Sequence, residues 1–220
     1  MTSRRYEWII HEAFERCRDV QGSSLAQVVR DNLLLTERLL EVECDVFVFV
    51  SSIDVYPRND VLHTEDEQID AARITGLYGI TKLMAESLVR SKARRYIILR
   101  PGLLLGQYMR QNTVSRIASG DIASHTLAAE STFYLVGYAE IWELISQLLA
   151  RGMTGIYNAV RKNPVSLSDV AEVFGCKPKF GEYRYIAGNI SNENVANLVP
   201  AFQNDSSELL KRYFNTERLC

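Results

Sequence analysis

The stretch DVFVFVSS at residues 45–52 decides the fold. Five apolar residues in a row, Val46 to Val50, show no alternation with polar residues, which is typical of a strand covered on both faces in a parallel sheet. Ser51 and Ser52 follow at its carboxyl end, the edge at which open α/β sheets bind ligands. Ser52 is therefore a candidate site residue, although a serine after a strand is more commonly a turn cap.

Strand and helix patterns alternate on both sides of this stretch. Apolar runs without alternation indicate two more strands, and apolar residues that recur at the spacing of one helix face indicate two helices. Ser23 or Ser24 is available as the N-cap of the first helix. The order strand, helix, strand, helix, strand predicts a parallel α/β sheet built from right-handed crossovers, with its strands as neighbours. The predicted elements are 6–11, 25–40, 45–50, 75–91 and 96–100.

The pattern becomes less regular after Gly102. Helices and strands still alternate, and Ser166 with Asp169 forms a capping box at the start of one helix. No repeat, low-complexity tract or linker separates this part from the first. The predicted helices are 112–119, 140–150, one from Ser166 and 205–214, and the predicted strands are 133–136 and 155–160.

The composition is that of an ordinary globular chain. The 220 residues are 47% hydrophobic and 24% charged, which excludes a disordered, collagen-like or coiled-coil protein. A net charge of −2 gives no footprint for nucleic acid, because phosphate binding needs clustered Lys and Arg. No stretch approaches the roughly 18 apolar residues of a membrane span, and the first residues are too charged for a signal peptide. We predict a cytoplasmic protein that binds neither nucleic acid nor membrane.

The four cysteines and three histidines lie far apart in the sequence. So few cysteines in a chain of this length indicate reduced thiols rather than a disulfide framework. Neither residue type shows the spacing of a metal site. We therefore predict no metal.

Tyr78 and Lys82 lie four residues apart on a predicted helix, so their side chains leave the same face one turn apart. An ammonium group in this position favours the tyrosinate, which makes a phenol usable as an acid or base near neutral pH. By itself the pair also fits an exposed tyrosine beside a solvated lysine. Its position after the strand that ends at Ser52 favours a functional role.

Taken together, these motifs resemble the extended short-chain dehydrogenase/reductase family of NAD-dependent sugar-nucleotide epimerases, dehydratases and reductases. The segments that carry the resemblance occur in the family's order over nearly the whole chain. They are SSIDVY (51–56), YGITK (78–82) with Glu86, ILRPG (98–102), WIIHEA (8–13), Asn32 and Thr36 in RDNLLLTERLLE (30–41), STFYLV (131–136), GIYNAV (155–160) and VSLSDVAEVFG (165–175).

The resemblance implies a Rossmann-type parallel sheet at residues 1–105, a partial dinucleotide-binding core. It also implies a small mixed α/β substrate-binding region at 106–220 that is partly interleaved with the core. The implied ligands are NAD or NADP and a nucleotide sugar.

The resemblance also assigns roles to individual residues. It implies that Ser52 holds the substrate oxygen and that Tyr78 is the acid/base. Lys82 lowers the pKa of the tyrosine and binds the nicotinamide ribose. Asn32 supports the geometry of the site. The remaining cofactor-binding positions, in addition to Tyr78 and Lys82, are Ala13 and Pro101.

The sequence departs from the family at its beginning. None of its twelve glycines forms the G-x-x-G-x-x-G turn, which in the family meets the pyrophosphate at a helix N-terminus. Roughly the first 60 family residues have no counterpart, so we expect an N-terminally truncated sheet. Its uncovered edge predicts a homo-oligomer or a partner chain. We expect binding of NAD or NADP to be weak.

Two interpretations of the function remain open. Ile53 and Asp54 replace the paired acidic residues of the dehydratases, which leaves a 4-epimerase or 4-ketoreductase acting on a nucleotide sugar. The alternative is a pseudoenzyme or gene fragment of the same family that acts as an interaction module. The retained Ser52, Tyr78 and Lys82 favour the enzyme, and the missing glycine turn favours the alternative.

Overall fold

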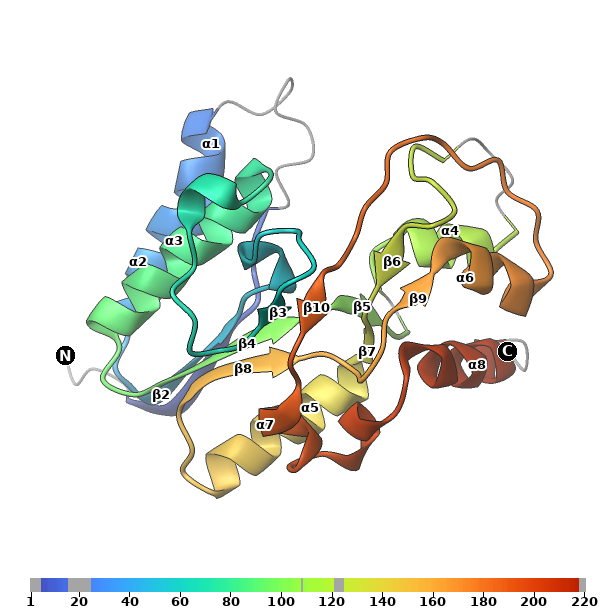
Figure 1. Cartoon of the computed structure of the whole chain (residues 1–220). Coiled ribbons are helices and arrows are strands. Elements are labelled where there is room, and N and C mark those ends of the chain that lie inside the picture. Colours follow the sequence, from blue (N-terminus) through green and yellow to red (C-terminus); the bar gives the residue numbers. More distant parts are fainter. Residues whose placement is uncertain (1–4, 16–24, 108, 121–124, 218–220) are drawn as a thin grey trace. The chain divides into compact units, whose positions relative to one another are not determined.

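The computed structural model describes residues 5–15, 25–107, 109–120 and 125–217 (Figure 1). The chain folds into two compact units that interleave in sequence. The first unit comprises residues 1–58, 63–101 and 148–158, and the second comprises 59–62, 102–147 and 159–220.

A four-stranded sheet in the order β1, β2, β4, β8 forms the first unit. Its strands are β1 (Tyr6–His11), β2 (Cys44–Val50), β4 (Tyr96–Pro101) and β8 (Gly155–Ala159). The strand β2 pairs in parallel with β1 through Phe47 opposite Ile9, and with β4 through Phe47 opposite Tyr96. The predicted parallel α/β sheet is confirmed. The five apolar residues of β2 are all buried, as the run without alternation predicted.

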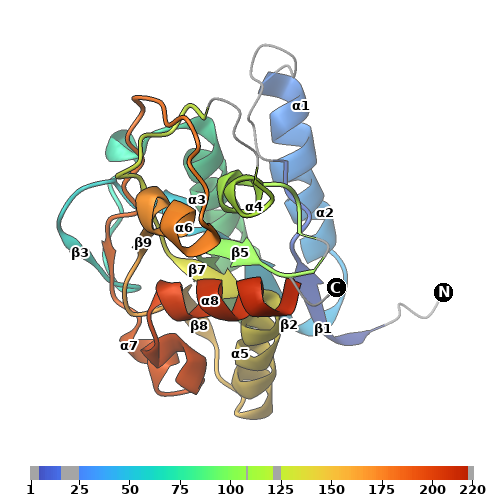
Figure 2. The same cartoon turned by 90° about the vertical axis from the view of Figure 1, so that its right-hand side faces the viewer.

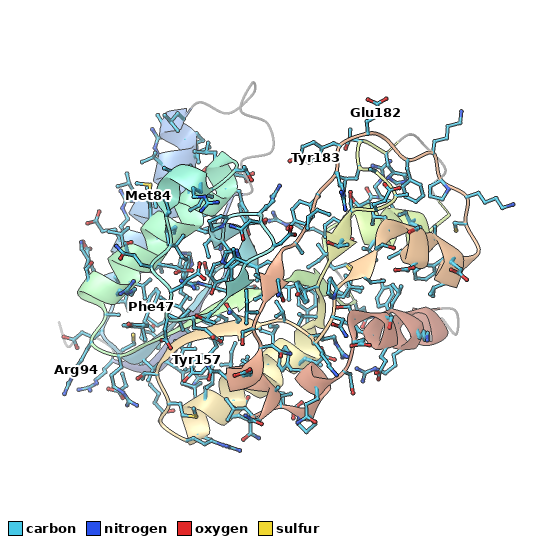
Figure 3. The ribbon with its side chains drawn as sticks, viewed as in Figure 1. Phe47, Met84, Arg94, Tyr157, Glu182 and Tyr183 are labelled. Atoms are coloured by element: carbon cyan, nitrogen blue, oxygen red, sulfur yellow. The ribbon has the colours of Figure 1, made fainter. Side chains whose placement is uncertain are left out.

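Helices cover one face of this sheet. They are α1 (Leu25–Val29), a π-helical turn (Arg30–Leu34), α2 (Leu35–Leu40) and α3 (Leu77–Lys92). Figure 2 shows α1 and α2 continuing into each other along one axis. Apolar side chains from α3, β2 and β4 form one buried cluster that includes Phe47, Val89 and Ile98. Met84 lies on the outer side of α3 and is half exposed, whereas Phe47 points into the core (Figure 3).

The predicted helix 25–40 is interrupted by the π-helical turn. Its central residue, Asn32, is fully buried and uses its side chain to bind the backbone of Glu15, far away in sequence. Apolar periodicity cannot reveal such a turn, because a long-range hydrogen bond holds the turn and not the spacing of apolar residues. The predicted N-caps of this helix, Ser23 and Ser24, lie outside the described residues.

Among the described residues, β1 forms an edge of the sheet. Tyr6 and Trp8 on this strand are 39% and 41% exposed. Edge strands with exposed apolar side chains favour pairing with another chain. The predicted partner or second copy at this edge stays a prediction.

The second unit is built from short strands and helices around its own core. The parallel pair β5–β7 and the antiparallel pair β6–β9 lie in this unit, and α6 packs on α4 and α8 (Figure 2). Its elements are β5 (Leu103–Leu105), α4 (Thr113–Ala118), β6 (Thr132–Phe133), β7 (Leu135–Gly137), most of α5 (Tyr138–Ala150), β9 (Val165–Ser166), α6 (Leu167–Phe174), β10 (Asn189–Ile190), α7 (Glu193–Ala196) and α8 (Ser206–Glu217). The strand β3 (Leu62–His63) and three 3₁₀ turns, Ile53–Val55, Ala71–Arg73 and Pro200–Gln203, complete the described structure.

The predicted strand 133–136 is wrong as a single element. The chain changes partner at Tyr134, where β6 pairs with β9 and β7 pairs with β5. The carbonyl of Tyr134 accepts a hydrogen bond from Leu103 N, and a Cβ at Gly102 would lie 2.4 Å from that carbonyl oxygen. The strand is therefore divided by a close backbone approach that glycine permits. The capping box of Ser166 and Asp169 is confirmed.

Candidate active site

Ser52 lies immediately after β2, in extended conformation, and caps the 3₁₀ turn Ile53–Val55. Its side-chain oxygen accepts a hydrogen bond from Asp54 N at 3.1 Å, and its hydroxyl has a longer contact of 3.4 Å with the Asp54 carboxylate. The turn cap, which was the alternative interpretation of Ser52 from the sequence, is therefore present. Because the oxygen accepts from the backbone, the hydroxyl proton is left to donate to another acceptor.

The first turn of α3 packs closely against this serine turn. A Cβ at Gly79 would lie 2.1 Å from the backbone oxygen of Asp54, so only glycine allows the helix to approach this closely. Gly79 follows Tyr78 directly, and Tyr78 is half-buried. The contact therefore brings the start of α3, with Tyr78, up to the end of β2, with Ser52.

Lys82 lies one turn further along α3 and is almost completely buried, with 3% of its surface exposed. Its ammonium donates a hydrogen bond to the carbonyl of Val50, at the end of β2, at 2.6 Å. The ammonium also lies 3.9 Å from the ring centroid of Phe14, 4.8 Å from that of Phe49 and 5.8 Å from that of Tyr78. Burial lowers the pKa of Lys82 to about 7, and the nearby Glu86 offsets part of this effect.

Replacing Lys82 by methionine is expected to raise the free energy of unfolding by about 2–3 kcal/mol at pH 6. The pKa of Lys82 falls from 10.5 to about 7 on folding, and each unit is worth about 1.4 kcal/mol. The variant also loses the Val50 hydrogen bond and the ring contacts, which lowers its free energy of unfolding by about 2 kcal/mol and offsets part of this gain. Because the unfolded chain binds more protons between these two pKa values, wild-type stability rises with pH from about 7 to 10.5. The advantage of the variant should shrink over this window.

Urea unfolding at pH 6 and pH 10 measures this effect. Lys92 provides the matched control, since it lies on the same helix but pairs with Glu37 at the surface. Lys92→Met should change stability by less than about 1 kcal/mol at either pH. A Lys82→Met variant no more stable than wild type at pH 6 would contradict this cost of burying the ammonium.

Asn32 connects the segment after β1 to the helices. Its amide oxygen accepts from Glu15 N at 2.7 Å and its amide nitrogen donates to Glu15 O at 3.0 Å. Its own carbonyl accepts from the hydroxyl of Thr36, which is also 2.9 Å from Nε2 of the buried His11. Burial lowers the pKa of His11 to about 4, so the ring is neutral at physiological pH. Asn32 thus supports the segment that carries Phe14.

The two other predicted cofactor positions lie at or just after the ends of β1 and β4. Ala13 follows β1 and is exposed, next to Phe14, and Pro101 is the buried last residue of β4. Sequence reasoning missed Phe14, whose ring lies against both Lys82 and Tyr78, with 6.0 Å between the centroids of Phe14 and Tyr78. No sequence signal identifies Phe14, because its neighbours on α3 are more than sixty positions away.

The hydrogen-bond donors of the site suit the nicotinamide end of a dinucleotide. A phenol and an ammonium lie on one helix face, beside a serine at the carboxyl end of parallel strands. The ring of Phe14 lies against the ammonium, which donates one hydrogen bond to Val50 O and carries three N–H donors in total. No group of three or more His, Cys, Asp or Glu suited to a metal occurs within the described part of the chain. In that same part, no helix is both long and apolar enough to cross a membrane.

Comparisons with known proteins show the family of the chain. The sequence pattern of the NAD dependent epimerase/dehydratase family matches residues 1–140. A sequence search of the curated proteins finds no significant match.

Solved structures of similar fold cover almost the whole chain. MoeE5 in complex with UDP-glucuronic acid and NAD is 20% identical with a TM-score of 0.79, over 97% of this chain and 80% of that one. UDP-glucuronic acid 4-epimerase from Bacillus cereus, with UDP-glucuronic acid and NAD, is 16% identical with a TM-score of 0.76, over 97% and 76%. A dTDP-4-dehydrorhamnose reductase from Clostridium acetobutylicum is 15% identical with a TM-score of 0.78, over 96% and 81%. At these identities the likeness shows a common fold.

Proposed function

The chain belongs to the NAD dependent epimerase/dehydratase family, and from this premise we propose that it transfers hydride between NAD(P) and a carbon of a nucleotide sugar, as a 4-epimerase or 4-ketoreductase. The observation that carries the proposal is the close packing of the α3 start, with Tyr78 and Lys82, on the serine turn at the end of β2. The complexes of similar fold with UDP-glucuronic acid and NAD support the choice of ligand class.

In this proposal Ser52, Tyr78 and Lys82 each have a defined role. Ser52 donates a hydrogen bond from its hydroxyl to the sugar oxygen, in place of the long contact with Asp54. Tyr78 takes the proton from the sugar hydroxyl, or returns it, at its phenol oxygen. Lys82 holds a ribose hydroxyl and favours the tyrosinate by its charge. The cofactor, when bound, supplies the acceptor and donor of the hydride.

Asn32 acts in this proposal through the segment that follows β1. Its double hydrogen bond to Glu15 holds the segment of Ala13 and Phe14. This segment borders the Lys82 ammonium, so its position controls access to the ammonium. We therefore retain Asn32 as a supporting residue and Ala13 and Pro101 as cofactor neighbours.

A non-catalytic role is the second candidate, and one observation favours it. The ring of Phe14 lies against the ammonium of Lys82, which is the group that the cofactor would need. A protein that had lost cofactor binding would tolerate such a contact. Its exposed β1 edge would then serve as an interaction surface.

Titration with NAD⁺ and NADP⁺, followed by incubation with a nucleotide sugar, distinguishes the two candidates. Calorimetry measures cofactor binding, and NMR of the sugar product detects inversion or reduction at carbon 4. UDP-glucuronic acid, UDP-glucose and dTDP-4-dehydrorhamnose are the first substrates to test, because they occur in the names of similar structures. We expect weak binding of one cofactor and turnover at millimolar cofactor concentration. If the protein shows no cofactor binding and no turnover at that concentration, the proposed enzyme function is rejected.

A further inference from the structure

A buried carboxylate lies directly behind the candidate site. Glu86 is one turn after Lys82 on α3 and only 1% exposed. Its Oε1 accepts hydrogen bonds from Ser51 Oγ at 2.5 Å and Arg100 Nε at 3.0 Å, and its Oε2 accepts from Arg100 Nη2 at 2.7 Å. Sequence reasoning quoted Glu86 and the segment of Arg100 only as parts of matching motifs. These three hydrogen bonds in the interior require a reason beyond packing, because a buried ion pair is poor evidence for stability.

The partners of Arg100 keep this carboxylate in one place. Nη1 of Arg100 donates to the hydroxyl of Tyr56 at 2.6 Å. The pKa of Tyr56 is raised to about 12, mainly by burial, so the phenol is neutral. Its oxygen lies 2.8 Å from Asn158 Oδ1 and 3.0 Å from Thr64 O, and one of these accepts its proton. The ion pair of Glu86 and Arg100 thus has neutral partners in Ser51 and Tyr56, and a second buried carboxylate, that of Glu65, accepts from Asn158 N and acts on Tyr56.

The charged and titratable groups around Lys82 come from three elements. His11, on β1, is neutral because burial lowers its pKa to about 4. Tyr78 and Glu86 lie on α3 with Lys82 itself, and Arg100 lies on β4 behind Glu86. The carboxylate of Glu86 favours the charged form of Lys82, against the cost of burial.

We propose that Glu86 is a positioning residue of the candidate site: held in place by Arg100, it favours the charged form of Lys82, and through Ser51 it fixes the end of β2 from which Ser52 projects. One carboxylate thus serves both the lysine and the serine. The role of Glu86 rests on the proposed function, because that function gives Lys82 and Ser52 their tasks.

The direct test is a pH titration of Lys82 by NMR in protein labelled at the lysine Cε carbon. The chain has six lysines, and the signal of Lys82 is identified by its loss in Lys82→Arg. In wild-type protein this signal should titrate well below the others. Glu86→Gln should lower its midpoint by about one further unit, because an opposite charge at short range is removed.

Three further variants exclude a general structural effect. Ser51→Ala removes a hydroxyl that binds Glu86 without changing any charge, so the Lys82 midpoint should stay within about 0.3 units. Glu37→Gln removes a surface carboxylate that pairs with Lys92, and should leave Lys82 unchanged. Glu86→Gln combined with Arg100→Met leaves no uncompensated buried charge, and keeps the test open if the single variant does not fold. The double variant should still show a lowered midpoint, because Glu86 lies one turn from Lys82 on α3 and favours its charged form, whereas Arg100 lies on β4.

An unchanged or raised Lys82 midpoint in the folded Glu86→Gln proteins would overturn the proposal. This outcome is separable from failure of the proposed function, because the titration needs neither cofactor nor substrate. Absence of cofactor binding and turnover in the wild-type protein rejects the function, whereas an unmoved Lys82 signal rejects the role of Glu86.

Discussion

Replacement of Tyr78 by phenylalanine is expected to lower turnover of the nucleotide sugar by about 10²- to 10⁴-fold, the usual contribution of a positioned acid or base. The ring remains, so its edge contact with Phe14 and the packing of the α3 start are preserved. Only the phenol oxygen that would exchange the proton is lost. The free energy of unfolding and cofactor binding should therefore change little.

Steady-state kinetics of the purified variant, with a parallel measurement of cofactor binding, checks this expectation. Tyr183→Phe is the matched control, because Tyr183 is 58% exposed and lies in the second unit (Figure 3). It should keep wild-type turnover. A Tyr78→Phe variant that retains more than a tenth of wild-type turnover would show that another group transfers the proton.

Replacement of Glu140 by glutamine is expected to destabilise the protein by about 3–5 kcal/mol, because it leaves a buried cation without its anion. Glu140 lies in the first turn of α5, and its Oε2 accepts from the backbone N of Gly137 at 3.0 Å. Its Oε1 accepts from the guanidinium of Arg161, which is fully buried, and from Arg212 at 3.1 Å. Within the described residues, Arg161 Nε has no hydrogen-bond partner. The loss of this carboxylate would thus isolate a charge that already lacks one partner.

Urea unfolding of the variant measures the cost. The side chain of Arg212 binds the same oxygen but is 60% exposed, so Arg212→Gln should cost less than about 1 kcal/mol. The double change Glu140→Gln with Arg161→Met removes both charges and should recover most of the lost stability. If Glu140→Gln alone stays within 1 kcal/mol of wild type, water or another group compensates Arg161.

The sequence was sufficient for features that depend on near neighbours. The run Val46–Val50 predicted a buried parallel strand, and the strands on either side proved to be its partners. The spacing of Tyr78 and Lys82 predicted a shared helix face, and both residues lie on α3. A strand covered on both faces and a helix with one apolar face need particular residue types at fixed short spacings. For this reason these elements could be predicted from the sequence alone.

The tertiary structure alone decided which groups surround the site. The ring of Phe14 contacts the ammonium of Lys82. Glu86 binds Ser51 and Arg100, and Asn32 binds Glu15 from within a π-helical turn. In sequence, Glu86 lies 35 positions from Ser51 and 14 from Arg100. Phe14 and Lys82 lie further apart still. Such contacts depend on how the helices pack on the sheet, and no local spacing encodes that packing. The sequence therefore determined which side chains could do the chemistry, and only the packing of α3 on β2 and β4 decided how buried, how charged and how accessible they are.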